Sequence, residues 1–308
     1  MVENKKENNA GVIRLRGIFP PISTPFDKNG ATAVEALRSN LSFLNRFDLQ
    51  GYVVMGSNGE FVTLTPEEKV QVMEAARKAI PGDKLMIAGT GCQSTKETME
   101  LTNTAAKIGA DAALILPPFY YKKLMTLDVL VKHFFTIADS SPIPILVYNM
   151  PACTGIDLDE ETILSLSEHE NIIGLKDSSG SIVKIGALNN KLPGFQILAG
   201  SGSFLVPALS VGAVGGVLAL ANMAPLYCLQ LVEHFTAGRI AEARELQNSM
   251  IPVNNAITGR WGVPALKAAL DHLGLYGGPV RPPLLPVSAD ILSQLKDILS
   301  EGGVEPLG

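Results

Sequence analysis

Short runs of apolar residues alternate along the chain with longer segments in which apolar and polar residues recur at helical spacing. The short runs show almost no polar alternation, which is typical of strands buried on both faces of a parallel sheet. Eight of them precede residue 240: Gly17–Phe26, Gly51–Ser57, Lys84–Gly91, Ala112–Phe119, Ile143–Met150, Ile172–Asp177, Gln196–Ser201 and Gly216–Ala221.

The longer segments are predicted to be amphipathic helices, because their apolar residues share one face and their charges lie on the other. Clear examples are Thr65–Ile80, Thr95–Ile108 and Leu127–Ala138. The stretch Thr65-Pro66-Glu67-Glu68 has the features of a helix start, with threonine as N-cap, proline at the first helical position and acids in the first turn.

Regular strand–helix alternation predicts an α/β protein with a parallel sheet, and eight repeats favour closure into a (β/α)8 TIM barrel. The alternative is an open doubly wound sheet. That fold would be expected to carry a G-x-G-x-x-G turn after an early strand, and the first two strands lack one.

Three more helical stretches follow the eighth unit: Ile240–Ile257, Pro264–His272 and Ala289–Leu299. No linker rich in proline, serine or charge separates them from the barrel, so they are predicted to form a C-terminal helical extension and not an independent domain. We expect a disordered N-terminal segment over 1–14, the barrel over 15–238, and the extension, packed on the barrel, over 239–308.

Composition narrows the function classes. The 308 residues carry a net charge of −5 with scattered lysines and arginines, so nucleic-acid binding is not expected. The apolar stretch 214–232 is interrupted by glycine, asparagine and proline, which argues against a membrane helix. Three cysteines without C-x-x-C spacing are typical of reduced thiols in an intracellular protein. The first ten residues contain no arginine, so we expect a cytoplasmic protein, or a mitochondrial one if a transit peptide has been removed.

In barrel enzymes the reacting residues come from the C-terminal ends of the strands. Lys176 ends the sixth predicted strand behind the apolar run Ile172–Leu175, where burial disfavours the charged ammonium form. A neutral amine attacks a ketone to give an iminium, which is an electron sink for carbon–carbon cleavage. The alternative is a lysine that faces the helix layer and pairs with an acid.

Polar groups on neighbouring strands are candidates for the same site. Tyr148 ends the fifth strand, and its phenol could move a proton between the amine and a substrate hydroxyl. Ser57 and Asn58 follow the second strand and could hold a carboxylate without a cation. Gly200 would let the backbone approach a ligand. Each has a purely structural alternative, as a core tyrosine, a tight turn or a turn glycine.

No metal site is predicted. Of the four histidines, His133, His234 and His272 fall in predicted helices and His169 follows one on the opposite rim, so a zinc- or histidine-dependent mechanism is disfavoured. An all-carboxylate magnesium site at Glu60 and Asp177 is a weaker alternative. Asp177 is better interpreted as holding a loop.

Four motifs, in order along the chain, resemble the dihydrodipicolinate synthase / N-acetylneuraminate lyase superfamily of pyruvate-dependent class I aldolases. They are Gly56-Ser57-Asn58-Gly59-Glu60, Tyr148-Asn149-Met150-Pro151, Gly174-Leu175-Lys176-Asp177-Ser178-Ser179 and the run from Gly278 to Leu284. The resemblance extends from about Gly17 to the C-terminal helices.

This resemblance implies a role for each residue of the site. Lys176 is expected to form the Schiff base, Tyr148 to shuttle protons, and Ser57 and Asn58 to bind the pyruvyl carboxylate. Tyr120 matches a tyrosine that reaches into a neighbouring subunit's site, which implies a homotetramer made of tight dimers. Further substrate contacts are expected from Ser178, Gly200 and Leu218.

Departures from the motifs favour one subgroup. Dihydrodipicolinate synthases usually carry an arginine where this chain has Cys153, and two threonines in place of Ser57-Asn58. Sialic acid lyases usually carry acidic residues after the strand-seven glycine, where this chain has Ser201-Gly202-Ser203. The run Ala199-Gly200-Ser201, with Asn58 and Ser178, is most similar to the 4-hydroxy-2-oxoglutarate aldolases of animal mitochondria.

We therefore expect a lyase that cleaves a 4-hydroxy-2-oxo acid, best represented by 4-hydroxy-2-oxoglutarate, to pyruvate and an aldehyde such as glyoxylate. No cofactor is expected beyond the covalent lysine, and no nucleic acid or membrane partner. Alternatives with the same iminium are a 2-keto-3-deoxy sugar acid aldolase or dehydratase and a dihydrodipicolinate synthase-type condensation. A non-catalytic 2-oxo acid binding protein is the alternative from a different class.

Overall fold

The structure is a computed structural model that describes residues 13–306 of the chain. Most of the segment 1–14, for which we expect disorder, therefore lies outside the described residues. Of its two described residues, Ile13 contacts the barrel: its carbonyl accepts a hydrogen bond from Gln196 Nε2 at 2.9 Å.

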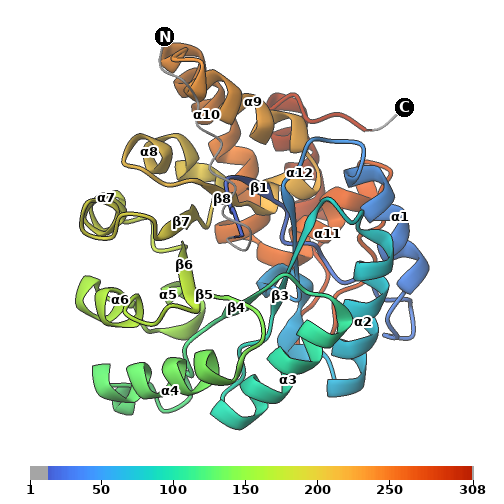
Figure 1. The fold of residues 1–308 in the computed structure, drawn as a ribbon. Coiled ribbons are helices and arrows are strands. Elements are labelled where there is room, and N and C mark those ends of the chain that lie inside the picture. The colour runs from blue at the N-terminus through green and yellow to red at the C-terminus, as the bar shows by residue number, and fades with distance from the viewer. Residues whose placement is uncertain (1–12, 307–308) are drawn as a thin grey trace.

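Eight parallel strands form the centre of the molecule, as predicted (Figure 1). They follow one another in chain order around the sheet, and β1 also pairs with β8. The Gln50 amide, next to β2, donates to the Ile18 carbonyl of β1 at 3.2 Å, and two more backbone hydrogen bonds join Val53 of β2 to Pro20 and Ile22 in the segment after β1. The prediction of a (β/α)8 barrel is confirmed. The strands are β1 (Gly17–Phe19), β2 (Gly51–Val54), β3 (Leu85–Gly89), β4 (Ala112–Ile115), β5 (Ile145–Asn149), β6 (Ile172–Asp177), β7 (Gln196–Ala199) and β8 (Gly215–Val217).

Helices surround the strands and cover their outer face (Figure 1). Around the barrel lie α1 (Val34–Leu44), α2 (Pro66–Ala79), α3 (Thr95–Ile108), α4 (Leu127–Ser140), α5 (Pro151–Thr154), α6 (Glu160–Leu166), α7 (Ile182–Lys191), α8 (Leu205–Ser210) and α9 (Pro225–Thr236). The predicted start of α2 is correct: Thr65 Oγ1 accepts from the Glu68 amide, and the Glu68 carboxylate accepts from the Thr65 amide. This reciprocal capping fixes the loop that precedes α2.

Alternation along the strands separates two apolar regions. One fills the barrel interior and includes Val53, Tyr148, Leu198 and Val217. The other lies between strands and helices and includes Leu175. The register pairs Lys176 with Tyr148 on β5 and with Leu198 on β7. Because paired residues of a parallel sheet face the same side, the Lys176 side chain points into the barrel and not toward the helix layer.

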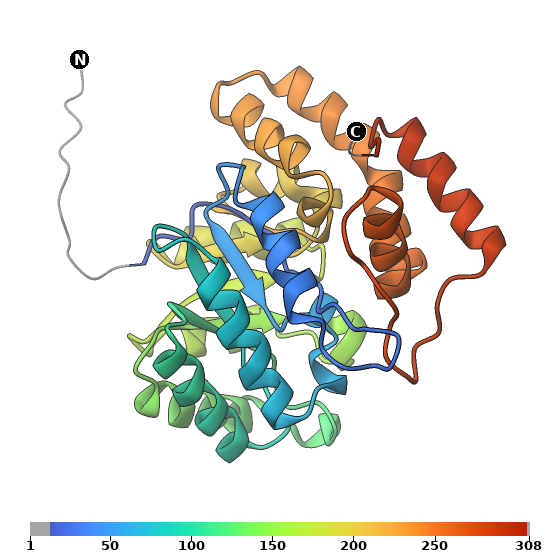
Figure 2. The same cartoon turned by 90° about the vertical axis from the view of Figure 1, so that its right-hand side faces the viewer.

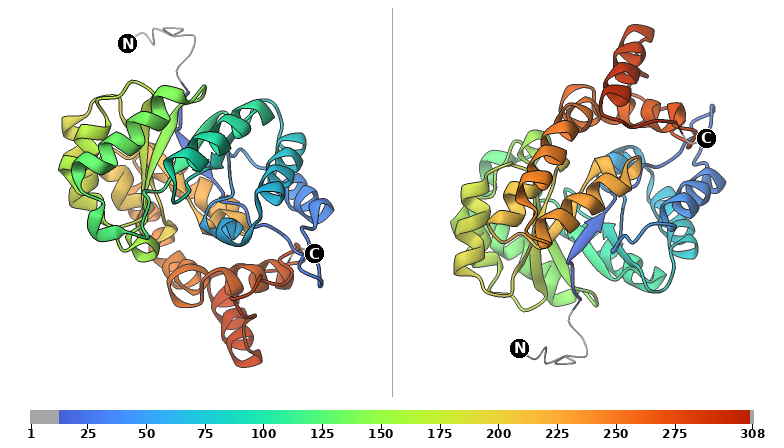
Figure 3. Two further views of the ribbon diagram at one scale, coloured as in Figure 1. Left: turned by 90° about the horizontal axis from the view of Figure 1, so that it is seen from below. Right: turned by 90° about the horizontal axis from the view of Figure 1, so that it is seen from above.

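The C-terminal helices α10 (Ile240–Asn255), α11 (Gly262–His272) and α12 (Ala289–Glu301) stand over one end of the barrel, coloured orange to red (Figures 2 and 3). A single π-helical turn, Ala256–Arg260, connects α10 to α11.

A buried ion pair attaches this extension to the barrel. Glu60 Oε1 lies 2.5 Å from Lys267 Nζ, and each side chain is 1% exposed. The Arg281 amide donates to the other Glu60 oxygen at 2.9 Å. Breaking a buried pair leaves one charge uncompensated, so the extension and the loop after β2 are held as one unit.

Apart from β6, each strand is shorter than the apolar run that predicted it, and the difference is largest at β1. The apolar run 17–26 forms a strand only over Gly17–Phe19, since Pro20 and Pro21 have no N–H to donate to the ladder. The run 216–221 leaves the sheet after Val217, and Ala219–Asn222 form a 3₁₀ turn. None of the helices within residues 13–306 has the length and apolarity to span a membrane.

Candidate active site

A cavity of about 400 Å³ opens at the C-terminal ends of the strands and is roofed by the turn between α10 and α11. Six residues predicted for the site line it: Ser57, Asn58, Tyr148, Lys176, Ser178 and Gly200. They come from the ends of β2, β5, β6 and β7. The barrel therefore brings together groups that are more than a hundred residues apart in sequence.

Lys176 extends from the interior face of β6 toward this cavity. Its side chain is 3% exposed, and Nζ lies 3.8 Å from the centroid of the Tyr148 ring. Within residues 13–306 the Lys176 amine makes no hydrogen bond and no ion pair. The interpretation of Lys176 as a structural lysine paired with an acid therefore does not fit the structure. An amine that is buried, unpaired and next to a cavity is available to attack a ligand carbonyl.

Tyr148 and Ser57 bring two hydroxyls to the same side of the cavity. Their oxygens are 3.5 Å apart, and Tyr148 is 4% exposed. Ser57 and Asn58 open the 3₁₀ turn Ser57–Gly59, which ends at Glu60 in the left-handed region with φ 51°. A non-glycine residue in that region is held there by its surroundings. The ion pair between Glu60 and Lys267 supplies that restraint and fixes the turn that presents Ser57 and Asn58.

Ser178 offers a hydroxyl with no partner of its own. Its Oγ is buried and has no hydrogen bond within the described part of the chain. It lies against Gly200, where an added Cβ would stand 1.9 Å from Ser178 Oγ. The Gly200 amide donates to the Asp177 carbonyl at 2.7 Å, so the two loops are locked together. Glycine at position 200 therefore leaves room for the Ser178 hydroxyl at the cavity wall.

Substitution of this glycine is expected to reduce activity strongly. In Gly200→Ala the new methyl group would stand 1.9 Å from Ser178 Oγ and 2.8 Å from both the Asp177 carbonyl oxygen and Ser178 Cα, so the hydroxyl and the backbone next to Lys176 would both have to move. Misplacement of a site group by about 1 Å typically costs roughly 100-fold in rate. We expect a loss of this order in kcat/KM, with unchanged far-UV circular dichroism. Gly82→Ala is the control, because a Cβ there meets nothing within 4 Å. Equal kinetics for Gly200→Ala and wild type would show that the close approach has no role.

Asp177 holds the loop after β6, as predicted. Its Oδ1 accepts from the Ser179 amide at 2.6 Å and from the Ser179 hydroxyl at 2.5 Å. Its Oδ2 accepts from Asn149 and lies 3.2 Å from Lys184 Nζ. The carboxylate is fully committed to these contacts and is not among the groups that line the cavity.

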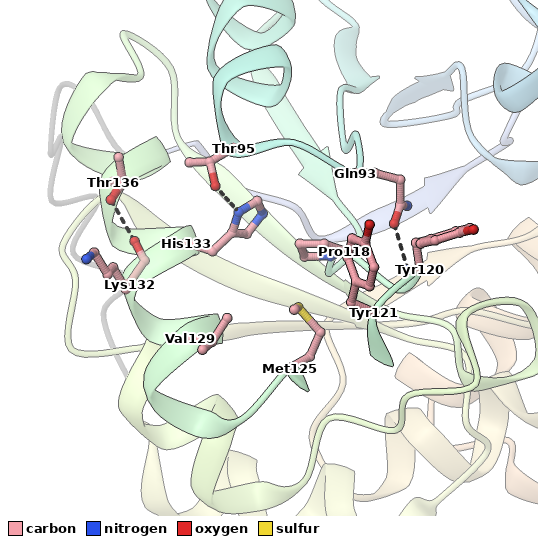
Figure 4. Close-up of a pocket in the computed structure, with 10 residues that line it drawn as sticks. All are labelled: Gln93, Thr95, Pro118, Tyr120, Tyr121, Met125, Val129, Lys132, His133 and Thr136. Carbon is pink, nitrogen blue, oxygen red and sulfur yellow. Dashed lines mark hydrogen bonds between the residues drawn. The ribbon is translucent and has the colours of Figure 1, made fainter. Parts of the chain in front are cut away.

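Two predicted site residues do not line the cavity of their own chain. Tyr120 is 77% exposed and lies in a second, more open groove, at the opposite end from His133 and Lys132 (Figure 4). Leu218 is buried against the helix layer, whereas its neighbours Val217 and Ala219 line the cavity. The cause is the two-residue period of extended backbone, which turns the Leu218 side chain away from the interior.

The roof of the cavity was missed at the sequence level. Ile257, Thr258, Gly259, Gly262 and Val263 line it from the extension. No local pattern marks these residues, because their position depends on how the extension packs over the barrel mouth. The sequence gives only one weak signal, two glycines within a few residues of a helix break.

Charge is scarce around the cavity. Among the lining residues Lys176 is the only one with a charged side chain, and the others are apolar residues, glycines and neutral hydroxyl, amide or thiol groups. Within residues 13–306 no group of three or more histidine, cysteine, aspartate or glutamate residues could hold a metal ion. His133 lies in α4, as predicted, where burial lowers the pKa of its imidazole to about 4.

Comparisons with known proteins define the class: the chain is a lyase of the class I aldolase type. It belongs to the dihydrodipicolinate synthetase family, which it matches over residues 14–302.

Curated relatives in this family carry two different activities in their names. A 4-hydroxy-tetrahydrodipicolinate synthase from Methanothrix thermoacetophila is 36% identical, and the alignment covers 93% of this chain and 97% of that protein. A probable mitochondrial 4-hydroxy-2-oxoglutarate aldolase from Emericella nidulans is also 36% identical, over 92% of this chain and 94% of that protein. Synthase names are the more frequent among these relatives.

Solved structures show the same fold. A dihydrodipicolinate synthase from Acinetobacter baumannii, determined in complex with pyruvate, superposes with a TM-score of 0.90 at 30% identity. The superposition covers 94% of this chain and 100% of the Acinetobacter baumannii chain.

Proposed function

We propose that this chain is a Schiff-base aldolase that uses Lys176 to cleave a 4-hydroxy-2-oxo acid, with 4-hydroxy-2-oxoglutarate as its preferred substrate. The observation that carries the proposal is the Lys176 amine, 3% exposed and unpaired among the described residues, at the wall of a 400 Å³ cavity. The products are pyruvate and glyoxylate.

The reaction follows from the placement of the groups. The Lys176 amine adds to the C2 carbonyl, and loss of water gives an iminium. The Tyr148 phenol gives its proton to the hydroxyl that leaves as water, and the resulting phenolate accepts the proton of the C4 hydroxyl as the C3–C4 bond breaks. The bonding electrons move into the iminium to give an enamine. Glyoxylate leaves. Protonation at C3 and hydrolysis of the resulting iminium then release pyruvate and restore the amine.

The substrate carboxylate next to the ketone has a matching receptor. Ser57 and Asn58 present hydroxyl and amide groups on the turn fixed by Glu60, and the Ser57 oxygen is already 3.5 Å from Tyr148. Preorganised neutral donors hold a carboxylate without a counter-cation. These contacts would orient C2 toward Lys176.

Position 153 supports a retro-aldol reaction over a synthase reaction. Cys153 lines the cavity at the position where dihydrodipicolinate synthases usually carry an arginine, and the cavity contains no other cation than Lys176. The second candidate is nevertheless condensation of pyruvate to 4-hydroxy-tetrahydrodipicolinate, favoured by the names of most of the relatives. Both reactions begin with the same iminium.

Turnover assays separate these candidates. The purified chain is assayed for pyruvate release from 4-hydroxy-2-oxoglutarate and from 2-keto-3-deoxy sugar acids, and for formation of 4-hydroxy-tetrahydrodipicolinate. We expect kcat/KM for 4-hydroxy-2-oxoglutarate to exceed the others by at least about tenfold. Faster synthase turnover would replace the proposal with the second candidate.

Chelation is expected to leave the reaction unchanged, because the iminium of Lys176 takes the place of a Lewis acid. Dialysis against EDTA should alter kcat for 4-hydroxy-2-oxoglutarate cleavage by less than about twofold, and added Mg²⁺ or Zn²⁺ should not raise it. A loss of activity that a divalent cation restores would contradict this part of the proposal.

We also propose that a second copy of the chain covers the exposed tyrosine and that the assembly is a homotetramer. Tyr120 and Tyr121 are 77% and 66% exposed, and the groove they line has a volume of about 700 Å³ (Figure 4). Gln93 accepts hydrogen bonds from the amides of Phe119 and Tyr120, so the exposed tyrosine is held on an ordered loop. An ordered exposed aromatic pair is typical of an interface.

Complementation tests whether Tyr120 acts in the partner's site. Lys176→Ala and Tyr120→Phe chains should each have little activity alone, but mixed assemblies formed by co-expression should regain activity. In a mixed pair the intact lysine of one chain meets the intact tyrosine of the other. No gain above the sum of the separate variants would show that Tyr120 acts only within its own chain or not at all.

A further inference from the structure

Three polar side chains form a network at the mouth of the cavity. Asn254, in α10, is 1% exposed, and its Nδ2 donates to Ser201 Oγ at 2.9 Å and to Ser203 Oγ at 2.8 Å. The Ser203 amide donates to the same Ser201 oxygen at 3.2 Å. Ser201 lines the cavity, whereas Ser203 does not.

These contacts determine where the Ser201 hydroxyl can donate. A serine hydroxyl has two lone pairs and one proton. Two N–H groups, from Asn254 and Ser203, already occupy both lone pairs. The Ser201 hydroxyl proton therefore points away from these two N–H groups. Because Ser201 lines the cavity on its other side, the proton is directed into the cavity. Asn254 thus turns a serine that could accept or donate into a donor toward the ligand space.

Ser201 is also placed apart from the groups that hold the reacting end of the substrate. The register pairs Lys176 with Leu198, so Ser201 lies three residues farther toward the mouth. Around the barrel, β7 is separated from β2, which carries Ser57 and Asn58, by β8 and β1. A ligand whose first carboxylate lies at Ser57 and whose ketone meets Lys176 would therefore direct its far end toward Ser201.

The charges around the cavity determine which groups can bind the far end of the substrate. Lys176 is the only charged lining residue and is consumed in the Schiff base, so a second carboxylate has to be held by neutral donors. Ser201, together with the unpartnered Ser178 hydroxyl, provides them. Hydrogen bonds to a carboxylate are about twice as strong as neutral ones.

We infer that Ser201, oriented by Asn254, binds the distal carboxylate of a five-carbon 2-oxo diacid. The inference rests on the Schiff-base chemistry of the proposed function and adds the group that recognises a diacid. Ser201 is the binding residue and Asn254 a positioning residue.

The test uses two non-cleavable 2-oxo acids of equal chain length, so that it does not depend on turnover. 2-Oxoglutarate has a carboxylate where 2-oxopentanoate has a methyl group, and both form a Schiff base that borohydride reduces to a stable adduct. The concentration for half-maximal adduct formation, read by intact-protein mass spectrometry, gives the affinity for each. We expect Ser201→Ala to weaken the binding of 2-oxoglutarate about 10- to 100-fold and to change the affinity for 2-oxopentanoate by less than about twofold.

Two more variants separate binding from structural damage. The Ser203→Ala variant loses the same kind of contact with Asn254, but Ser203 does not line the cavity. The preference of this variant for the diacid should therefore match that of the wild type. Asn254→Asp would accept the Ser201 proton and withdraw it from the cavity, so it should lose the preference as Ser201→Ala does. Equal weakening of both acids by Ser201→Ala, or a wild-type preference in Asn254→Asp, would overturn the inference.

The outcome is independent of the choice of substrate above. If the chain does not cleave 4-hydroxy-2-oxoglutarate but Ser201→Ala still abolishes the preference for 2-oxoglutarate, the proposed substrate is wrong and the diacid subsite stands. If cleavage occurs and Ser201→Ala leaves the preference intact, the proposed function stands and the assignment of Ser201 fails.

Discussion

Lys176→Ala is expected to abolish turnover, with kcat reduced on the order of 10⁵-fold, as for loss of the nucleophile in other covalent enzymes. Without the amine no iminium forms, and the C3–C4 bond has no electron sink. The Lys176 amine is buried but makes no ion pair or hydrogen bond within residues 13–306, so its removal leaves no opposite charge without a partner. The variant should therefore fold, and pyruvate release from 4-hydroxy-2-oxoglutarate is the measurement.

The matched control is Lys96→Ala, because the Lys96 side chain in α3 is 84% exposed and does not line the cavity. It should retain wild-type kinetics. Residual activity of Lys176→Ala within about tenfold of wild type, in protein of native thermal stability, would show that another group performs the chemistry.

Tyr148→Phe is expected to lower kcat by about 10²- to 10⁴-fold, the range for loss of a general acid–base group. The substitution keeps the ring that lies 3.8 Å from Lys176 Nζ and removes only the hydroxyl that faces Ser57. Because the Schiff base itself still forms, borohydride should still trap a pyruvate adduct in this variant. The expected result is thus a large loss of kcat with covalent trapping preserved.

Tyr52→Phe controls for the loss of a buried tyrosine hydroxyl. The Tyr52 hydroxyl donates to Asn45 at 2.7 Å and does not line the cavity. Its variant should keep wild-type kcat. If Tyr148→Phe also kept it, proton transfer would have to be assigned to another group, such as Ser57 or water.

Much of the fold follows from local patterns. The eight apolar runs predicted all eight strands, because strands buried on both faces leave no polar positions in the sequence. The helix Thr95–Ile108 was predicted to the residue, since Ser94 caps its start and Gly109 ends it in the left-handed region. The errors fall where apolar sequence continues beyond the ladder, as at Pro20–Pro21 and after Val217.

The site residues also fall into those that the sequence could place and those that it could not. Lys176, Tyr148 and Ser57 could be placed from the sequence because the ends of barrel strands converge by topology. Leu218, expected to contact substrate, has its side chain in the layer between strands and helices, and the sequence alone does not show which of the residues 217–219 face the cavity. The roof residues Thr258 and Gly259 could not be placed, because their position depends on packing between segments that no local rule connects.

The C-terminal extension contributes to the site in two ways. Lys267 holds Glu60 and so fixes the turn that presents Ser57 and Asn58. Asn254 orients Ser201 at the mouth. The barrel supplies the amine and the phenol, while the extension fixes the two ends at which a diacid would be held. Differences in the extension would therefore alter specificity without touching the Schiff-base lysine.

Peptide mapping of a borohydride-reduced pyruvate adduct tests the central claim most directly. Wild-type protein is incubated with pyruvate, reduced, digested and sequenced by tandem mass spectrometry. A single adduct on the peptide that contains Lys176, absent from Lys176→Ala, is the predicted result. An adduct of equal yield on the Lys176→Ala chain, or on a different lysine of the wild type, would contradict it.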